Sequence, residues 1–233
     1  MVSYDVFGEA LMAFHEGRLN EPLILHNSYG EDEEMPIDVF FRDEEEFSEL
    51  EYIALALCDG KVLDVGAGAG SHALYLQQQG YEVTALEISS LACKLMHDRG
   101  VKRVIRDDIF AYHGDTFDTL LFLMNGIGLA ENTSGLERLL HHCKGLLRAG
   151  GQLLFDSSDI SYLYHPEPPP QTPYFGEVTF QYEYQHQKGD TFGWLYIDQA
   201  TLTKLAQAHG WVVQILYEDE NDQYLARLSL RST

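Results

Sequence analysis

The sequence has few basic residues and no long apolar run, and each shortage excludes a class of protein. Lys and Arg total 15 against 37 Asp and Glu, which gives a formal net charge of −22 at pH 7. Such a chain repels a phosphate backbone unless basic residues cluster, and none do, so nucleic acid is not expected as a partner. The sequence also lacks a run of about 18 apolar residues and a secretion signal, so we expect neither membrane spanning nor export.

Cysteine is also scarce. Cys58, Cys93 and Cys143 are far apart in the sequence and lack the C-x-x-C spacing of zinc or redox sites. Their odd number does not suggest a disulfide framework, so we expect a reducing, cytoplasmic environment and no metal site. Apolar residues, by contrast, make up 45% of the 233 positions, which is enough for one large core.

Short apolar runs alternate with helical periodicity through the middle of the chain. Strands are expected at 61–65, 81–86, 101–105, 117–123 and 152–156, and helices at about 71–79, 89–99 and 134–147. A parallel connection must cross back over the sheet, usually as a helix, so the alternation predicts an α/β fold with a mostly parallel sheet. A further helix is expected just before it, capped by Asp43 with Glu46 three residues later.

The two ends of the chain have other patterns. An amphipathic helix is expected over Val6 to Phe14, followed by irregular connector or lid to residue 42, so we divide the chain into a cap, 1–42, and a main domain, 43–233. After Asp156, a proline-rich loop and strands at 178–184 and 191–197, with a turn at 188–190, predict a hairpin insertion at about 157–198. A helix capped by Asp198 and two antiparallel strands, at 211–218 and 223–230, close the chain.

The stretch V-L-D-V-G-A-G-A-G-S, residues 62–71, joins a strand to a helix. Its glycines permit positive φ and let a ligand touch the backbone. Glu87 ends the next strand, where a carboxylate can accept two hydrogen bonds from the vicinal diol of a ribose. Asp107 and Asp108 follow the third strand, where one of them could accept from an adenine amino group. Together these residues predict a nucleotide-type cofactor site.

Taken together, D-V-G-A-G-A-G, the acid ending strand two, R-D-D-I, F-D-T-L-L-F-L and L-L-R-A-G-G-Q-L-L-F resemble a class I S-adenosylmethionine-dependent methyltransferase. The resemblance covers about residues 43–156, and the last helix and strand pair are similar to the closing hairpin of that family. It implies a Rossmann-like fold whose mixed, mostly parallel seven-stranded sheet has helices on both faces, with the N-terminal helical cap and the hairpin insertion added. The implied cofactor is S-adenosyl-L-methionine.

The resemblance also implies a role for individual residues. Gly66, Ala67, Gly68 and Gly70 would line the methionine part of the cofactor, with Asp64 helping to hold its ammonium group. Glu87 would bind the ribose, Ile88 would pack on adenine, and Asp108 with the Ile109 backbone would meet the adenine edge; His72 and Asp107 are counted with this site. Met124 and Asn125, at the end of strand four, would face the transferred methyl group.

The expected reaction is an in-line attack by an O, N or S atom on the cofactor's methyl group, for which proximity and a dry site are the protein's main contributions. A dedicated base is optional; the candidates are His26, Tyr29 and His72. The D/N-P-P-Y/F signature of amino-group methylation of bases or glutamine is replaced by N-G-I-G at 125–128, which argues against nucleobase methylation.

The acceptor is therefore expected to be a small molecule or, second, a protein side chain. Aromatic residues of the insertion either form part of a lid suited to a cationic or amine acceptor or only cover the hairpin's own core: Phe175, Tyr182, Tyr184, Trp194 and Tyr196. Two other functions stay open, a nicotinamide-dependent oxidoreductase, whose glycines are spaced G-x-G-x-x-G, and a protein that binds S-adenosylmethionine without turnover. Either a monomer or a homodimer fits the sequence.

Overall fold

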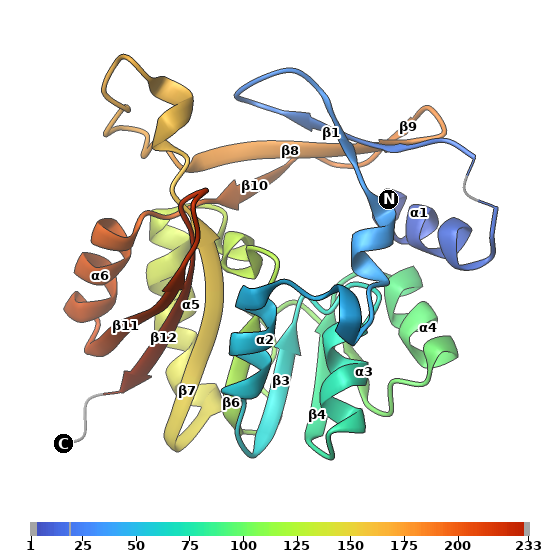
Figure 1. The fold of residues 1–233 in the computed structure, drawn as a ribbon, viewed down its shortest axis with the longest axis horizontal. Coiled ribbons are helices and arrows are strands. Elements are labelled where there is room, and N and C mark those ends of the chain that lie inside the picture. Colours follow the sequence, from blue (N-terminus) through green and yellow to red (C-terminus); the bar gives the residue numbers. More distant parts are fainter. Residues whose placement is uncertain (1–3, 19, 231–233) are drawn as a thin grey trace.

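A seven-stranded sheet forms the centre of the computed structural model, which describes residues 4–18 and 20–230. Its order is β11-β12-β7-β6-β3-β4-β5 (Figure 1). The strands are β3 (Lys61–Val65), β4 (Glu82–Glu87), β5 (Val104–Arg106), β6 (Phe117–Phe122), β7 (Leu147–Ser158), β11 (Trp211–Glu218) and β12 (Gln223–Leu230). The first five are mutually parallel, and β12 is antiparallel to both of its neighbours, β7 and β11, which confirms the predicted class I methyltransferase-like sheet.

Helices cover both faces of this sheet. One face packs against α2 (Glu49–Ala56), α3 (Ser71–Gln78) and α4 (Ser90–Arg99), and the other against α5 (Thr133–Leu146) and α6 (Gln199–Ala208). Side chains of β3 alternate between the two, with Leu63 and Val65 in the α5 core and Val62 in the α2 core. The same alternation directs Asp64 to the face that α2 and α3 cover.

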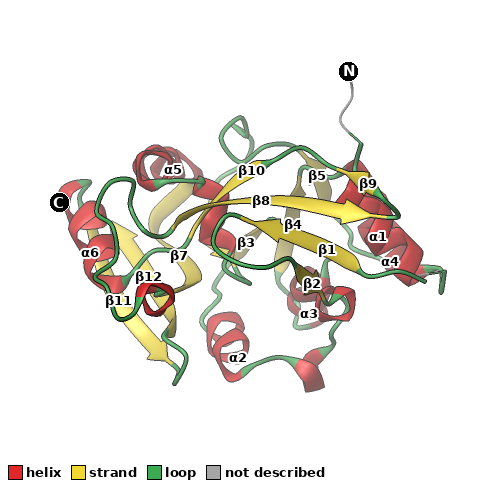
Figure 2. Cartoon of the chain, turned by 90° about the horizontal axis from the view of Figure 1, so that it is seen from above, coloured by secondary structure: helices red, strands yellow, loops and turns green. Residues whose placement is uncertain are grey.

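A second, smaller sheet lies across the carboxyl ends of the parallel strands (Figures 1 and 2). It contains β1 (Leu23–Asn27), β2 (Glu33–Met35), β8 (Glu177–Tyr184), β9 (Gln187–Lys188) and β10 (Phe192–Leu195), in the order β10-β8-β1-β2 with β9 paired to β8. The N-terminal helix α1 (Val6–His15) packs beside it and against α4. The N-terminal segment and the hairpin insertion thus share one sheet.

The prediction of irregular structure for residues 18–42 was wrong. Leu25 of β1 pairs with Tyr182 of β8, so the strand forms on a partner distant in sequence, and its own five residues give only a weak pattern. Between the strands and α2 are the short helices η1 (Ile37–Phe40) and η2 (Glu44–Glu46). The predicted helix start at Asp43 is real, but it caps η2; Ser48 then caps α2 with a second capping box.

The two faces of the second sheet differ in composition. Leu25, Tyr182 and Phe180 belong to the inner face, which is turned to the parallel sheet, because Leu25 pairs with Tyr182 and all three are core residues. Trp194 of the same face lies so close to Gly128, in η3 (Gly126–Ala130), that a side-chain carbon there would collide with its indole ring. The outer face alternates with the inner one and carries polar residues such as Glu183.

The other differences from the prediction are local. The turn between β8 and the next strand falls at Gln185 and His186, both with positive φ, rather than at residues 188–190. The loop after β7 contains a short helix, η4 (Ser161–Tyr164). In the part of the chain that the structure describes, no helix combines the length and the apolar character needed to cross a membrane.

Candidate active site

The glycine loop lies between β3 and α3, at the carboxyl edge of the parallel sheet. Gly66, Gly68 and Gly70 have φ of +70°, +55° and +83°, which other residues adopt only with strain. The Gly66 N–H donates to the Leu86 carbonyl at 2.9 Å, which joins the loop to β4. A side-chain carbon on Gly68 would lie 3.4 Å from the ring of Phe40. The loop therefore presents bare backbone beneath the N-terminal segment.

Glu87 joins this loop to the end of β4. One carboxylate oxygen accepts from the Gly68 N–H at 2.9 Å, and the other accepts from the Ile88 and Ser89 N–H groups at 2.8 and 2.9 Å. Burial raises the pKa of Glu87, and these backbone donors oppose the rise. Ile88 next to it is 64% exposed, an apolar side chain left uncovered where the sequence predicts adenine packing.

Asp64 is the most unusual acid of the site. It is 2% exposed, and its Oδ2 is buried without a hydrogen-bond partner. Burial raises its pKa to about 6, only partly opposed by the charge of His72 and the Ala73 N–H. A buried carboxylate oxygen without a donor is costly, and an ammonium group placed beside it would remove that cost. The position fits the amino group of the methionine part of S-adenosylmethionine.

His72 is occupied by a neighbouring acid. Its Nε2 lies 2.8 Å from Glu51 Oε1, and the same oxygen accepts from Arg42 at 2.7 Å. Burial pushes the pKa of Glu51 up, but His72, the Ser48 N–H and Arg42 outweigh it and hold that pKa at about 2. His72 therefore lies at the base of the site in a fixed ion-pair network, a position that favours holding α2 and α3 together over proton transfer.

The turn after β5 forms the outer side of the site. Asp107 Oδ1 accepts from the Asp108 N–H at 2.9 Å, and Asp108 Oδ1 accepts from the Phe110 N–H at 2.9 Å. The Asp107 N–H donates to the Glu87 carbonyl at 3.2 Å, so the turn is next to Glu87. Asp108 is exposed and Ile109 is buried. The structure thus brings the three residues to the side of Glu87 where an adenine ring was expected.

Two strained residues follow β6. Met124 and Asn125 have φ of +60° and +55°, a left-handed conformation that costs non-glycine residues about 1–3 kcal/mol each and is concentrated at functional sites. The Asn125 N–H donates to Asp156 Oδ2 at 2.9 Å, which holds the strained backbone. Asn125 Oδ1 is buried without a partner. Both predicted residues therefore lie at the strand end, beside an acid.

That acid, Asp156 near the carboxyl end of β7, was missed as a site residue by the sequence analysis. It is fully buried, and its Oδ1 has no partner while its Oδ2 also accepts from Gln223 at 2.8 Å. Burial raises its pKa to about 6. The sequence did contain a signal for it. Asp156 follows the apolar run L-L-F, just as Glu87 follows the apolar residues at the end of the second strand.

The two remaining candidates for a base are on opposite faces of the second sheet. Tyr29 is near the inner face, where its hydroxyl donates to Glu33 Oε1 at 3.2 Å and burial raises its pKa. His26 is on the outer face, between Glu183 and Asp32 at 2.8 and 2.7 Å, and those hydrogen bonds raise its pKa. The sheet separates His26 from the strand ends, so its position does not favour a role as base.

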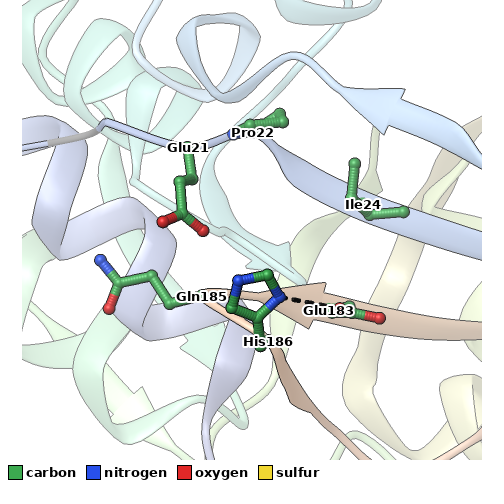
Figure 3. A pocket seen from close by; sticks show the side chains of 6 residues that line it. All are labelled: Glu21, Pro22, Ile24, Glu183, Gln185 and His186. Carbon is green, nitrogen blue, oxygen red and sulfur yellow. Dashed lines mark ion pairs between the residues drawn. The ribbon is translucent and has the colours of Figure 1, made fainter.

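The outer face also carries a pocket of about 200 Å³, which Figure 3 shows. It is lined by Glu21, Pro22, Ile24, Glu183, Gln185 and His186. Because Glu183 alternates with the inner residue Tyr182, this pocket is on the far side of the second sheet from the glycine loop. It is not part of the site assembled here.

Aromatic side chains dominate the inner face. Phe180, Phe192 and Trp194 pack on one another with ring centroids 6.0 to 6.5 Å apart. Burial raises the pKa of Tyr182, as does the charge of Glu87, and burial raises the pKa of Tyr196 to about 12, with Asp156 contributing. The charge of Glu87 therefore reaches Tyr182, and that of Asp156 reaches Tyr196. Of the other aromatics predicted for a lid, Tyr184 packs with α1 and Phe175 with Tyr174.

Comparison with known proteins places this geometry in a family. A family model described as "Methyltransferase domain" matches residues 63–155. The crystal structure of a S-adenosylmethionine-dependent methyltransferase from Bacteroides fragilis, in complex with S-adenosyl-L-homocysteine, is 37% identical, with a TM-score of 0.89 over 97% of this chain and 94% of that chain. No curated protein matches the sequence.

More distant solved structures share the fold. The CcbJ methyltransferase from Streptomyces caelestis is 11% identical, with a TM-score of 0.62 over 81% of this chain and 94% of that chain. The glycopeptide N-methyltransferase MtfA in complex with S-adenosylmethionine is 16% identical, with a TM-score of 0.58 over 82% and 96%. The match at 37% identity decides against the nicotinamide-dependent alternative. The chain belongs to the S-adenosylmethionine-dependent methyltransferases, enzymes whose cofactor is S-adenosyl-L-methionine.

Proposed function

We propose that this enzyme methylates an O, N or S atom of a small molecule that binds between the edge of the parallel sheet and the inner face of the second sheet. The observation that carries the proposal is the position of the second sheet, whose aromatic inner face lies over the strand ends that hold Asp64 and Glu87. In this proposal, the cap, residues 1–42, and the insertion, about 157–198, together form the acceptor side. A protein side chain is the less favoured acceptor, because this sheet covers the site.

The cofactor side follows from the contacts at the edge of the parallel sheet. When bound, S-adenosylmethionine supplies a methyl group activated by its positively charged sulfur. Asp64, whose buried Oδ2 has no partner, would accept from the cofactor's amino group, and the backbone of residues 66–70 would line its methionine part. Glu87 already accepts three backbone hydrogen bonds, which fix its carboxylate for the ribose hydroxyls. Ile88, Asp108 and the Ile109 backbone would hold the adenine, beside the turn that Asp107 shapes.

The protein's contribution to the reaction is alignment and exclusion of water. Met124 and Asn125 position the acceptor against the methyl group from the end of β6, and the inner aromatic face keeps water out. This proposal assigns no dedicated base, because each earlier candidate for that role already has another partner. Tyr29 is bonded to Glu33, His72 to Glu51, and His26 to Glu183 and Asp32.

The test combines cofactor binding with methyl transfer. Glu87→Ala is expected to weaken S-adenosylhomocysteine binding at least about tenfold in calorimetry. Glu82→Ala, at the other end of β4 and 64% exposed, is the matched control and is expected to bind as the wild type does. Transfer of labelled methyl groups to small amines, alcohols and thiols, but not to proteins, supports the proposal. Binding without transfer to any acceptor favours the non-catalytic alternative, and unchanged affinity in Glu87→Ala contradicts the site.

A further inference from the structure

The site contains more buried acid than the cofactor needs. Asp64 and Asp156 are 2% and 0% exposed, and each has one carboxylate oxygen without a hydrogen-bond partner. Within residues 4–18 and 20–230, none of the ion pairs includes either carboxylate. The methionine part of the cofactor has one amino group, which Asp64 beside the glycine loop accounts for. Asp156 is therefore left without a cation.

Strand register separates the two acids. Asp64 pairs with Leu121 of β6, and Leu121 pairs with Leu154 of β7, so Asp156 is on the same face of the sheet and two residues further along. Two strand spacings and two residue rises place the acids about 10 Å apart sideways and about 7 Å along the strands. Asp156 is thus further along the strands than Asp64, nearer the carboxyl edge of the sheet that the second sheet covers.

The hydrogen bonds that Asp156 already makes do not account for its second oxygen. Its Oδ2 accepts from the Asn125 N–H and from Gln223, and these contacts hold the strained end of β6. Its Oδ1 has no donor, and neither has Asn125 Oδ1 on the adjoining residue. The Asn125 amide N–H group donates to the Leu195 carbonyl at 3.4 Å, so its oxygen is the unused end of that side chain. Two residues joined by a hydrogen bond at the end of β6 thus each carry one buried acceptor without a donor. A primary amine has two N–H donors for them and one lone pair left to attack, whereas a hydroxyl has one donor.

We propose that the methyl acceptor is an amine and that Asp156, together with Asn125 Oδ1, binds its N–H groups; this rests on the proposed function. The amine reacts as the free base, after an ammonium form has released its proton to solvent. The new bond joins the amine nitrogen to the methyl carbon, while the bond from that carbon to sulfur breaks and its electron pair stays on sulfur. The positive charge consequently moves from sulfur to nitrogen, next to the Asp156 carboxylate. A fixed negative charge at the place where positive charge develops stabilises the transition state more than the ground state. Asp156 is a catalytic residue in this proposal.

The experiment measures acceptor binding apart from turnover. Benzylamine, 2-phenylethylamine, N,N-dimethylbenzylamine and benzyl alcohol are titrated into protein saturated with S-adenosylhomocysteine, because their rings suit the aromatic inner face. We expect both primary amines to bind more tightly than the dimethylated amine and the alcohol. Methyl transfer to the same compounds is expected to follow the same order. This comparison in the wild type does not depend on any variant folding.

Substitution then identifies the residue. Asp156→Asn is expected to lower primary-amine affinity and kcat/KM at least about tenfold while S-adenosylhomocysteine affinity stays within about twofold, which also shows that the variant is folded. Asp159→Asn is the matched control, because that carboxylate, three residues on, already accepts from the Ser161 N–H at 2.8 Å. It is expected to behave as the wild type does.

Three results would overturn the inference. These are equal amine affinity in Asp156→Asn and wild type, equal binding of benzylamine and benzyl alcohol, and the absence of binding by any amine. Transfer to an alcohol or a thiol alone would overturn it while leaving the proposed methyltransferase function intact. If the wild type does not bind S-adenosylhomocysteine at all, the proposed function itself is contradicted.

Discussion

The glycine loop and the second sheet meet at one site but are specified by the sequence in different ways. Residues 62–71 form a strand, a turn and a helix start in one continuous stretch, and Glu87 reaches it from the adjacent strand. The second sheet instead pairs Leu25 with Tyr182 and places Trp194 against Gly128. The comparison teaches that local sequence specifies the cofactor half, whereas the acceptor half depends on long-range pairing. Four variants test this difference, from the largest expected effect to the smallest.

The largest effect is expected where the two halves touch. Gly128→Ala would place a methyl group inside the indole ring of Trp194 and should lower the free energy of unfolding by about 1–3 kcal/mol, as overpacking does. Urea unfolding measures the loss. Trp194→Leu in the same chain should recover part of it, because it removes the collision, and strict additivity of the two single changes would contradict the contact.

The second variant separates stability from binding at Asp64. Its pKa, raised to about 6, means that the native state holds a proton more tightly than the unfolded chain, so stability falls as pH rises from about 4 to about 6. Asp64→Asn removes that fall and should leave the cofactor-free protein about 1–3 kcal/mol more stable than the wild type at pH 7.5. Urea unfolding at pH 4 and pH 7.5 measures the difference.

The control for this variant is Asp59→Asn, an exposed aspartate just before the same strand. It should leave stability unchanged at both pH values. If Asp64→Asn is less stable than the wild type at pH 7.5, the Asp64 carboxylate has a partner in the cofactor-free protein. That result contradicts its role as an unpaired acceptor for the cofactor.

The third variant concerns the glycine loop alone. Gly68 and Gly80 have φ of +55° and +91°, so alanine at either position carries a similar backbone cost of about 1–2 kcal/mol. Only Gly68 donates its N–H to Glu87 and lies under the expected cofactor. Calorimetry should therefore show S-adenosylhomocysteine affinity about tenfold lower in Gly68→Ala and unchanged in Gly80→Ala. Equal losses of affinity in the two variants would mean that backbone strain, and not contact with the cofactor, is the reason for glycine at position 68.

The smallest effect is expected on the outer face of the second sheet. Hydrogen bonds to Glu183 and Asp32 raise the pKa of His26 from 6.5, so its stabilising contribution is present below that pH and disappears as pH rises through the native pKa. His26→Gln should lower the thermal midpoint slightly at pH 5.5, leave it unchanged at pH 9, and leave methyl transfer unaffected. If His26→Gln lowers methyl transfer as much as Asp156→Asn does, His26 takes part in the reaction and its assignment to the outer face is contradicted.

The sequence predicts one half of the molecule better than the other for a physical reason. Parallel strands with crossover helices are encoded by periodicity within each segment, so the individual strands and the strand-end position of Glu87 follow from local patterns, whereas the single seven-stranded sheet was implied by the family resemblance. Strand β1 has five residues with Ile24 on its polar face, which hides the alternation until β8 supplies a partner. Which face of the second sheet carries the His26 side chain depends on that register, so it could not be predicted from the sequence of β1 alone.

Asp156 illustrates the remaining limit. Its place at a strand end is visible in the sequence, but its value as a site residue comes from the absence of a partner for Oδ1, which only packing decides. Asn125, predicted at the same place from the family resemblance, donates its N–H to Asp156 from the strained backbone after β6. The role of each remains a prediction for experiment.

The central claim is that two buried carboxylates divide the site, with Asp64 serving the cofactor and Asp156 the acceptor. Calorimetric titration of S-adenosylhomocysteine into Asp64→Asn and Asp156→Asn tests this most directly. The account predicts at least about tenfold weaker binding in Asp64→Asn and binding within about twofold of the wild type in Asp156→Asn. Equal losses in both variants, or a loss in Asp156→Asn alone, would contradict it.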